Sequence, residues 1–327
     1  MGQHDFDNFF GFEEYFYHDL EKAFSADIAC CDACYEDFVA MWPHAYSADD
    51  CCFQTQEIDL KWFYQYGYLR EEFSEDEFDH YIAQIECPRC GRPLAHTIWA
   101  YNFPFDIPES FEDTIKEVGE LARNTPFLLL THEFCQGVFA ALTDLSTEVT
   151  SVLVDQPLFR ARSTLSGNLA ESVECFDFPP AKFVQEGRYN HAGSPVLYLA
   201  SDKETCHAEL KGEPCLVLEF KLLSPIRILD LSDPFSAHHR YSDLLNSLVY
   251  SALVSSSQGD DGWHKPHYVV SRFVADCARA AGFDAIKYPS TRRSGTNFNL
   301  VLVNSSMSLA SNAQIVAYHR MMATLTK

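Results

Sequence analysis

Apolar residues recur at helical spacing along the first half of the chain. Over residues 109–123 they fall every three or four positions and form one stripe, which predicts an amphipathic helix. The same spacing predicts a second helix around residues 134–145. Residues 1–25 interleave aromatic with acidic residues, and several of the aromatic residues lie near helical spacing, which predicts a short docking helix.

The pattern changes character around residues 146–157. Beyond this segment the chain carries short apolar runs of the β type, broken by Gly, Pro and Ser. These runs predict strands at 152–154, 196–199, 216–220, 226–229, 285–288 and 300–303. Helices fit between some of them, at 202–211, 241–254 and 268–281. The pattern therefore predicts an α+β chain, in which a helix-rich first half precedes a mixed α+β domain.

Charge divides the chain at the same place. The chain has 327 residues, about twice the length of a typical domain. Residues 1–150 hold 30 acidic and 7 basic residues, whereas residues 151–327 hold 17 of each. This predicts two domains, 1–150 and 151–327, with different surfaces. A strongly acidic surface repels phosphate backbones, which argues against nucleic acid as a partner. A basic protein partner and plain solubility both remain open as reasons for the acidity.

The beginning of the sequence and its longest apolar runs indicate the cellular compartment in which the protein is expected. The first residues lack the basic and apolar regions of a secretory signal. No apolar run approaches the length that spans a bilayer. We therefore expect a cytoplasmic protein without a membrane partner. In a reducing compartment, the 12 cysteines are thiols and metal ligands and not a disulfide framework.

Two Cys-x-x-Cys pairs predict a zinc site in the first half. They are Cys31 with Cys34, and Cys87 with Cys90. Four thiolates match the four soft ligands that Zn²⁺ takes in a tetrahedron, and they leave no open position for water, so the metal would be structural. The choice between Cys31 and Cys30 stays open, as does the participation of three neighbours, namely His44, Cys51 and Cys52.

The second half carries a scattered set of residues suited to an anionic, aromatic ligand. Arg188 lies in a turn-rich stretch that leads into a strand holding Tyr198, and a helix then presents Glu209. Guanidinium groups bind phosphate with two parallel hydrogen bonds. Arg160 precedes this stretch, and a later strand ends at Ser290. Each residue alone is ordinarily part of a surface or a core, so the signal lies in the set.

Taken in order, these segments resemble the RES domain, a family named for an arginine, a glutamate and a serine. The resemblance runs from about residue 158 to residue 303. It rests first on a Gly-Arg-aromatic-Asn turn at residues 187–190, a glycine ahead of "PVLYLA" at 193–200 and a helix glutamate at 209. It rests also on the block "GFDAIKYPS" at 282–290 and on a strand that begins with Asn at 299–303. The first half resembles the zinc-knuckle module labelled HEPN/RES N-terminal, through the phrase at residues 31–38.

The resemblance implies an ADP-ribosyltransferase-like fold and an enzyme that degrades NAD. Relatives of this kind are toxins of toxin–antitoxin systems, held by an Xre-type antitoxin. The implied catalytic residues are Glu209, Arg188 and Ser290. The residues implied to bind NAD are Arg160, Tyr198, Asn190, Tyr189 and Ser271, of which Ser271 is also a rival for the family serine. An aromatic residue usually follows the first arginine of the family, but Ala161 does here, and Phe159 is a candidate to compensate.

The predicted activity is cleavage of the nicotinamide–ribose bond of NAD, by a hydrolase or a phosphorylase acting as a toxin or defence effector. Two further hypotheses are an ADP-ribosyltransferase acting on a protein and a non-catalytic, zinc-bearing interaction module. No residue decides between water, phosphate and a side chain as acceptor, although Arg292 and Arg293 are candidates for holding phosphate. An antitoxin or regulatory protein is an expected partner, and a homo-oligomer is left open.

Overall fold

The computed structural model divides the chain into two compact units. It describes residues 3–23, 27–43, 54–103, 105–108, 110–165, 167, 169–255, 268–290 and 297–323. Unit 1 comprises Met1–Ile107 with Tyr250–Ser257, and unit 2 comprises Pro108–Val249 with Gln258–Lys327.

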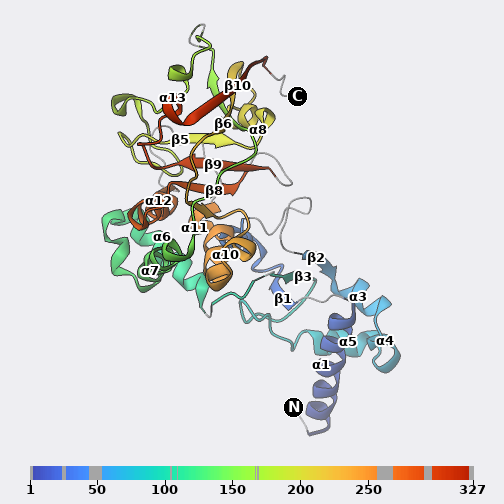
Figure 1. Ribbon diagram of the computed structural model, residues 1–327. Helices are drawn as coiled ribbons and strands as arrows, with labels where there is room; N and C mark the ends of the chain where they lie inside the picture. The colour runs from blue at the N-terminus through green and yellow to red at the C-terminus, as the bar shows by residue number, and fades with distance from the viewer. Residues whose placement is uncertain are drawn as a thin grey trace. The chain divides into compact units, whose positions relative to one another are not determined.

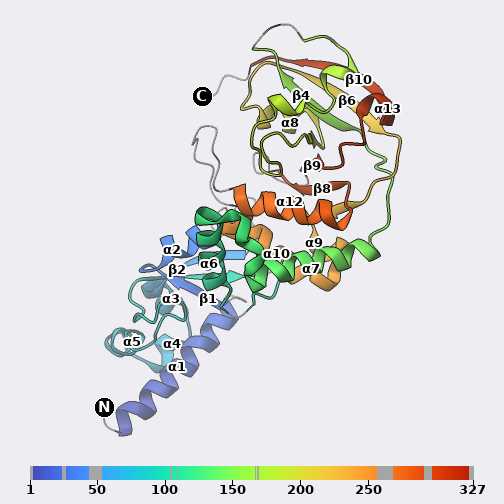
Figure 2. The same ribbon diagram turned by 90° about the vertical axis from the view of Figure 1, so that its left-hand side faces the viewer.

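Unit 1 begins with the long helix α1 (Gln3–Ala23), where the sequence predicts a helix. Figures 1 and 2 show α1 alongside α4 (Leu69–Glu72) and α5 (Glu75–Ile82). Phe12 and Phe16, one helical turn apart, are completely buried. Their rings face one side of α1 because residues four apart share a helix face, so the aromatic pattern of the sequence marks a buried stripe.

A small antiparallel sheet completes unit 1. Its strand order is β1-β3-β2, from β1 (Asp27–Cys31), β3 (Thr97–Asn102) and β2 (Gln54–Asp59). The remaining described helices of the segment before residue 108 are α2 (Tyr35–Met41) and α3 (Leu60–Tyr66). A bulge between Ile28 and Cys30 interrupts the β1–β3 register. This sheet and α2 together support the first cysteine pair.

Unit 2 is built on a seven-stranded sheet of order β10-β6-β4-β5-β9-β8-β7. Only β7 and β8 pair in parallel among the described strands, and the other neighbours are antiparallel. The strands are β4 (Leu158–Ser163), β5 (Leu197–Ala200), β6 (Cys215–Leu222), β7 (Ile228–Asp230), β8 (Ala285–Pro289), β9 (Phe298–Leu302) and β10 (Ala313–Met321).

A layer of helices lies near β8, the strand next to the β7 edge of this sheet. Figures 1 and 2 place α12 (Val269–Ala281) next to β8, with α7 (Glu133–Glu148) on its far side. Both α7 and α6 (Phe111–Asn124) pack against α12. The other described helices of unit 2 are short: α8 (Lys203–Glu209), α9 (Pro234–Ala237), α10 (Ser242–Tyr250), α13 (Leu309–Asn312) and the 3₁₀ helices η1 (Pro126–Thr131), η2 (Val173–Cys175), η3 (Ala181–Phe183) and η4 (His239–Tyr241). Helix α11 (Ala252–Ser255) belongs to unit 1.

The packing of α6 and α7 bears on the predicted domain boundary. The boundary predicted from the sequence lies at residue 150, whereas the compact units divide between Ile107 and Pro108. The difference arises because the apolar stripes of both helices face α12, which lies far away in the sequence. The boundary at residue 150 stays a prediction of how the chain is divided into domains.

The α+β class predicted for the chain is confirmed. Helices form at each of the predicted positions, and β5, β6, β7, β8 and β9 lie on predicted runs. Residues 152–154 are different, because only Val152 forms an isolated bridge, to Ile226. Strands β4 and β10 were not predicted, since polar residues interrupt both apolar patterns. None of the described helices combines the length and the apolar character that crossing a membrane requires.

Candidate functional site

The four cysteines predicted to bind metal converge in unit 1. Their sulfur atoms all lie within 4.8 Å of one another. Cys31 Sγ lies 3.9 Å from Cys34 Sγ and 3.7 Å from Cys90 Sγ, and Cys34 Sγ lies 3.8 Å from Cys87 Sγ. A tetrahedral zinc ion with four sulfurs at about 2.3 Å spaces those sulfurs about 3.8 Å apart. The donor set therefore fits zinc.

Two tight turns bring the sulfurs of each pair together. Cys31 ends β1, and the backbone amide of Cys34 donates to its carbonyl over 3.0 Å. In the second pair, the amide of Gly91 donates to the carbonyl of Cys87 over 2.9 Å, and Gly91 has a φ of +68°. Such a left-handed conformation favours glycine, which explains the Cys-Gly end of this turn.

An arginine links the two cysteine turns. Arg89, between Cys87 and Cys90, donates to the carbonyl oxygen of Cys34 over 3.3 Å and lies 3.6 Å from the carboxylate of Asp37.

The candidate ligand Cys30 is buried but is not in the cluster, because neighbouring residues of β1 point to opposite sides of the strand. Cys31 is therefore the member of this adjacent pair that joins the cluster. Three further candidate ligands, His44, Cys51 and Cys52, lie outside the described residues.

Most of the residues predicted to act on a ligand line one cavity of unit 2. It has a volume of about 410 Å³, within the usual range of ligand pockets. Arg160, Arg188, Asn190, Tyr198 and Glu209 all line it. They come from β4, the loop of residues 185–191, β5 and the end of α8, so the tertiary fold brings together positions spread over about 50 residues.

Arg160 is a buried cation in this cavity. Its side chain is anchored by donating to two backbone carbonyls, from Nε to Phe176 over 2.6 Å and from a terminal nitrogen to Tyr198 over 2.9 Å. Burial, and next the neighbouring charge of Arg162, lowers the pKa of Arg160 to about 9, which leaves it charged at neutral pH. Both hydrogen-bond partners are neutral carbonyls, and the charge of Asp177 opposes the lowering of the pKa of Arg160 only in part. An anionic ligand would compensate this charge.

Arg162 adds a second cation that was not assigned from the sequence. It lines the same cavity and donates to the carbonyls of Cys175 and Asp177 over 3.3 and 3.4 Å. Burial lowers its pKa. Residues two apart on a strand share a face, so Arg160-Ala-Arg162 is a pattern from which this pair could have been predicted.

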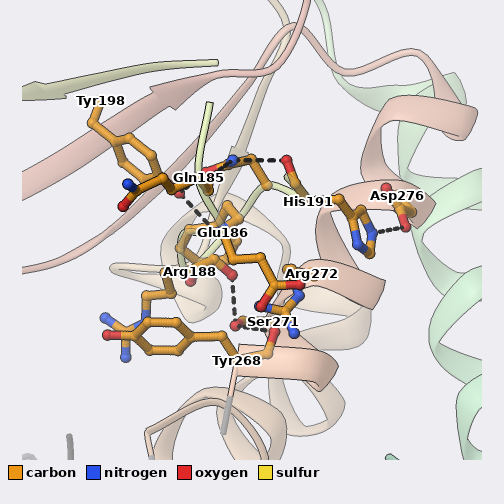
Figure 3. A network of polar contacts seen from close by, with 11 residues as sticks. Gln185, Glu186, Arg188, His191, Tyr198, Tyr268, Ser271, Arg272 and Asp276 are labelled. Carbon is orange, nitrogen blue, oxygen red and sulfur yellow. Dashed lines mark hydrogen bonds and ion pairs between the residues drawn. The ribbon is translucent and has the colours of Figure 1, made fainter. Parts of the chain in front are cut away.

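Arg188 is the third cation, held against aromatic rings. Its guanidinium carbon lies 5.6 Å from the ring centre of Tyr288 and 6.0 Å from that of Tyr189. Figure 3 shows the ring of Tyr268 beside the same side chain. Burial raises the pKa of Tyr288 and Tyr198 far above the usual value, so both phenols stay neutral. The cavity thus combines flat neutral rings with three cations.

Glu209 is the one carboxylate among the described residues lining the cavity. It is the last residue of α8, and Asn299 on β9 donates to its Oε1 over 2.8 Å. The hydroxyl of Ser290 lies 3.4 Å from the same oxygen, so the predicted glutamate and serine are neighbours. Asn299 was predicted as the start of a strand and not as a residue of the site.

Tyr189 and Asn190 support the cavity from inside the loop. The hydroxyl of Tyr198 accepts from the amide of Tyr189 and donates to Asn190 Oδ1, both over 2.9 Å. Asn190 Nδ2 donates to the carbonyls of Gln185 and His191. Tyr189 is 1% exposed and is absent from the described lining. These polar atoms therefore organise the turn, and contacts of Tyr189 and Asn190 with a ligand stay a prediction.

Gly187 is required by packing. A Cβ at this position would overlap Asn190 Oδ1 and lie 2.7 Å from the hydroxyl of Tyr198. The atoms next to this glycine therefore belong to the loop and to β5, and the absence of a side chain lets these two segments approach each other.

Ser271 lies behind the loop and not on the cavity wall. It is completely buried in α12, and its hydroxyl donates to the carbonyl of Arg188 over 2.7 Å (Figure 3). Phe159, the candidate to compensate for Ala161, packs toward Ala200 and Cys206 and lies 6.5 Å from the ring of His319, outside the described lining. Arg292 and Arg293 lie outside the described residues.

A larger cavity of about 820 Å³ lies on the opposite face of the sheet. Lys287 and Phe298 line it, whereas their chain neighbours Tyr288 and Asn299 line the arginine cavity, as the alternation of strand side chains requires. Its cations are already paired with carboxylates, for example Lys287 Nζ with Asp230 at 2.7 Å. We therefore assign the chemistry to the smaller cavity.

Comparison with known proteins agrees with the location of this cavity. Residues 157–321 match the family model described as the RES domain. Among solved structures, the chain is similar to one from the MbcT–MbcA toxin–antitoxin complex of M. tuberculosis, at 16% identity and a TM-score of 0.37, over 56% of this chain and 92% of that chain. The search of curated proteins found no match.

Proposed function

Since this chain belongs to the RES domain family, we propose that the arginine cavity binds NAD and that the enzyme cleaves its nicotinamide–ribose bond. The observation that carries the proposal is the charge of the cavity, whose described lining holds Arg160, Arg162 and Arg188 but one carboxylate, Glu209. NAD has the matching chemistry, with an anionic pyrophosphate, two aromatic groups and a ribose.

The arginines would capture the substrate. Guanidinium groups bind phosphate oxygens through parallel, charge-assisted hydrogen bonds. Arg160 is held by two backbone carbonyls and Arg188 by aromatic rings, so both are ordered before a ligand arrives. Tyr198 would lie against the nicotinamide or its ribose, since its ring lines the cavity while its hydroxyl is bound to the loop.

Glu209 would act on the bond that breaks. When the ribose carbon separates from the nicotinamide nitrogen, the bonding electrons leave with nicotinamide, which becomes neutral, and positive charge develops on the ribose. A carboxylate placed beforehand next to that charge stabilises it. The hydrogen bond from Asn299 would hold Glu209 in one orientation, and the hydroxyl of Ser290 lies near the same carboxylate oxygen.

The acceptor completes the reaction. Water would yield ADP-ribose and a proton, inorganic phosphate would yield phosphorylated ADP-ribose, and a protein nucleophile would yield an ADP-ribosylated side chain. We propose hydrolysis or phosphorolysis, because both consume NAD and suit the toxin role that the family implies. An antitoxin-type partner remains a prediction of the same resemblance, and a cytoplasmic location remains a prediction from the sequence.

We also propose that Cys31, Cys34, Cys87 and Cys90 bind a structural zinc ion. The support is the close approach of the four sulfurs and the agreement of their spacing with a tetrahedron. Bound zinc would cross-link two turns that lie far apart in the sequence and would supply no catalysis, because four thiolates complete its coordination.

The test is to incubate the purified full chain with NAD, with and without inorganic phosphate, and to identify the products by chromatography. Glu209→Gln should reduce NAD consumption by about a hundredfold or more. Glu204→Gln is the matched control, since Glu204 lies on the exposed first turn of the same helix.

Two results would refute the proposal. One is a folded, zinc-loaded wild-type chain that leaves NAD intact with and without phosphate. The other is Glu209→Gln with full activity, which would remove the carboxylate from the mechanism. The dependence of the products on phosphate separates hydrolysis from phosphorolysis.

A further inference from the structure

The loop that carries Arg188 is attached to α12 by three side-chain contacts on its outer side. Ser271 donates to the carbonyl of Arg188, Arg272 pairs with Glu186, and Asp276 pairs with His191 (Figure 3). The three α12 residues contact the start, middle and end of the loop. Arg272 and Asp276 are one helical turn apart and share a face of α12. Ser271 precedes Arg272 by one residue and lies about 100° around the helix from it.

The pair between Arg272 and Glu186 is the buried member of this set. The side chain of Arg272 is 4% exposed, that of Glu186 is 22% exposed, and their closest charged atoms are 3.3 Å apart. A buried charge is costly unless it is paired, so separating these two groups is strongly unfavourable. This pair therefore restricts the loop directly next to Arg188.

The third contact lies at the surface. His191 Nε2 is 2.7 Å from a carboxylate oxygen of Asp276, and both side chains are about half exposed. Asp276 also lies 3.5 Å from Arg279 on the same helix. Exposed pairs contribute little to stability, so we expect this contact to matter less than the other two.

We propose that Ser271 and Arg272 are positioning residues, which hold Arg188 where it binds the pyrophosphate of NAD. Neither residue lines the cavity among its described residues, so both act through the loop. This inference rests on the proposed function, and it gives α12 the role of setting ligand affinity. Because Arg188 would bind the pyrophosphate before and during bond cleavage alike, loss of the support should raise KM and leave kcat nearly unchanged.

The test is a double-mutant cycle with ADP-ribose as the probe, since it keeps the pyrophosphate and does not react. Titration calorimetry gives the Kd for the wild-type chain, Arg272→Met, Arg188→Ala and the double variant. We expect each single variant to bind at least tenfold more weakly. The double variant should match Arg188→Ala within twofold, because Arg272 would act only through Arg188. In turnover, KM should rise for Arg272→Met while kcat stays within twofold.

Ser271→Ala gives a second cycle with a smaller disturbance of the fold. It removes one hydroxyl and should weaken binding by about three- to tenfold, again only when Arg188 is present. Arg320→Met is the matched control for loss of an arginine, because Arg320 pairs with Glu171 on an exposed part of the same unit. It should leave the Kd unchanged.

The outcomes separate this inference from the proposed function. Additive losses in both cycles would overturn the inference, because they would mean that Ser271 and Arg272 act independently of Arg188. If the wild-type chain neither binds ADP-ribose nor consumes NAD, the proposed function fails. The positioning role is then judged by amide hydrogen exchange of residues 185–191. Faster exchange in Arg272→Met than in wild type supports it, and unchanged exchange overturns it.

Discussion

The cysteine cluster of unit 1 and the arginine cavity of unit 2 both gather polar side chains, but the cysteines lie close together whereas the arginines surround an open cavity. The cysteines lie 3.7–3.9 Å from one another in the contacts that connect them, so one ion would satisfy all four. The arginines line an open volume of about 410 Å³, and among the described lining residues they outnumber the carboxylates by three to one. A closed ligand set stabilises a fold, whereas an unbalanced charge around a cavity favours a ligand.

The two clusters also differ in how they are supported. Each cysteine pair is held by its own tight turn, through backbone hydrogen bonds between residues three or four apart. The cavity arginines depend on distant partners, such as the carbonyl of Phe176 for Arg160 and the hydroxyl of Ser271 for the loop of Arg188. Local support suits a metal site, and long-range support lets several elements tune one ligand site. Four predictions test this contrast.

The largest effect should come from breaking the closed cluster. Cys34→Ser removes one of four thiolates, and structural zinc binding is typically worth about 10–16 kcal/mol. We expect loss of zinc, measured as metal per chain, and loss of protease resistance in residues 27–103. The adjacent-cysteine control is Cys30→Ala, which should keep its zinc because Cys30 is outside the cluster. Zinc loss in that control would mean that Cys30 and not Cys31 is the ligand.

Removing a buried cation should produce the next largest effect. Arg160→Met keeps much of the side-chain volume but removes the charge, and breaking such a buried charged contact typically costs about 2–5 kcal/mol of binding. ADP-ribose should therefore bind at least about 30-fold more weakly, as measured by calorimetry. An unchanged Kd in a folded variant would show that this arginine serves the fold alone.

Filling the space beside Gly187 should have an intermediate effect. Gly187→Ala forces a methyl group against Asn190 and Tyr198, and overpacking of this kind costs about 1–3 kcal/mol of unfolding free energy. Gly137→Ala is the control, because Gly137 lies in α7 with no neighbouring atom within 4 Å of an added Cβ. That control should be stabilised by about 0.5–1 kcal/mol. Urea unfolding compares the stability of each variant with that of the wild-type chain. A Gly187→Ala variant as stable as the wild type would mean that the loop tolerates the methyl group.

The smallest effect should come from removing a hydrogen bond that orients the carboxylate of Glu209 while leaving Glu209 itself unchanged. Asn299→Leu removes the hydrogen bond of 2.8 Å to its carboxylate, and we expect kcat to fall about tenfold, or about 1.4 kcal/mol. Ser290→Ala removes a longer contact of 3.4 Å and should reduce kcat less. Steady-state kinetics compares the two variants. A much larger loss for Ser290→Ala would mean that the serine takes part directly, as the family name implies.

The local parts of this molecule were predictable from sequence. Helical stripes predicted α6 and α7, and the Cys-x-x-Cys spacing predicted both turns of the cysteine cluster, because these features depend on residues a few positions apart. Strand β4 was not predicted, because its arginines line the cavity and interrupt the apolar pattern on which the prediction depends. The order of family motifs led to Arg188 and Glu209, but it did not reveal Arg162 or Asn299.

By itself, the sequence therefore determined the α+β class, the four cysteines that cluster and five of the residues that line the arginine cavity. Tertiary structure decided which of these residues line the cavity and which ones support the others. Ser271 is the clearest case, because a buried serine on a helix has the same sequence signal whether its hydroxyl faces a cavity or a backbone carbonyl. Only the packing of α12 against the loop made it a partner of Arg188. That packing joins residues 83 positions apart, beyond the range of any local pattern.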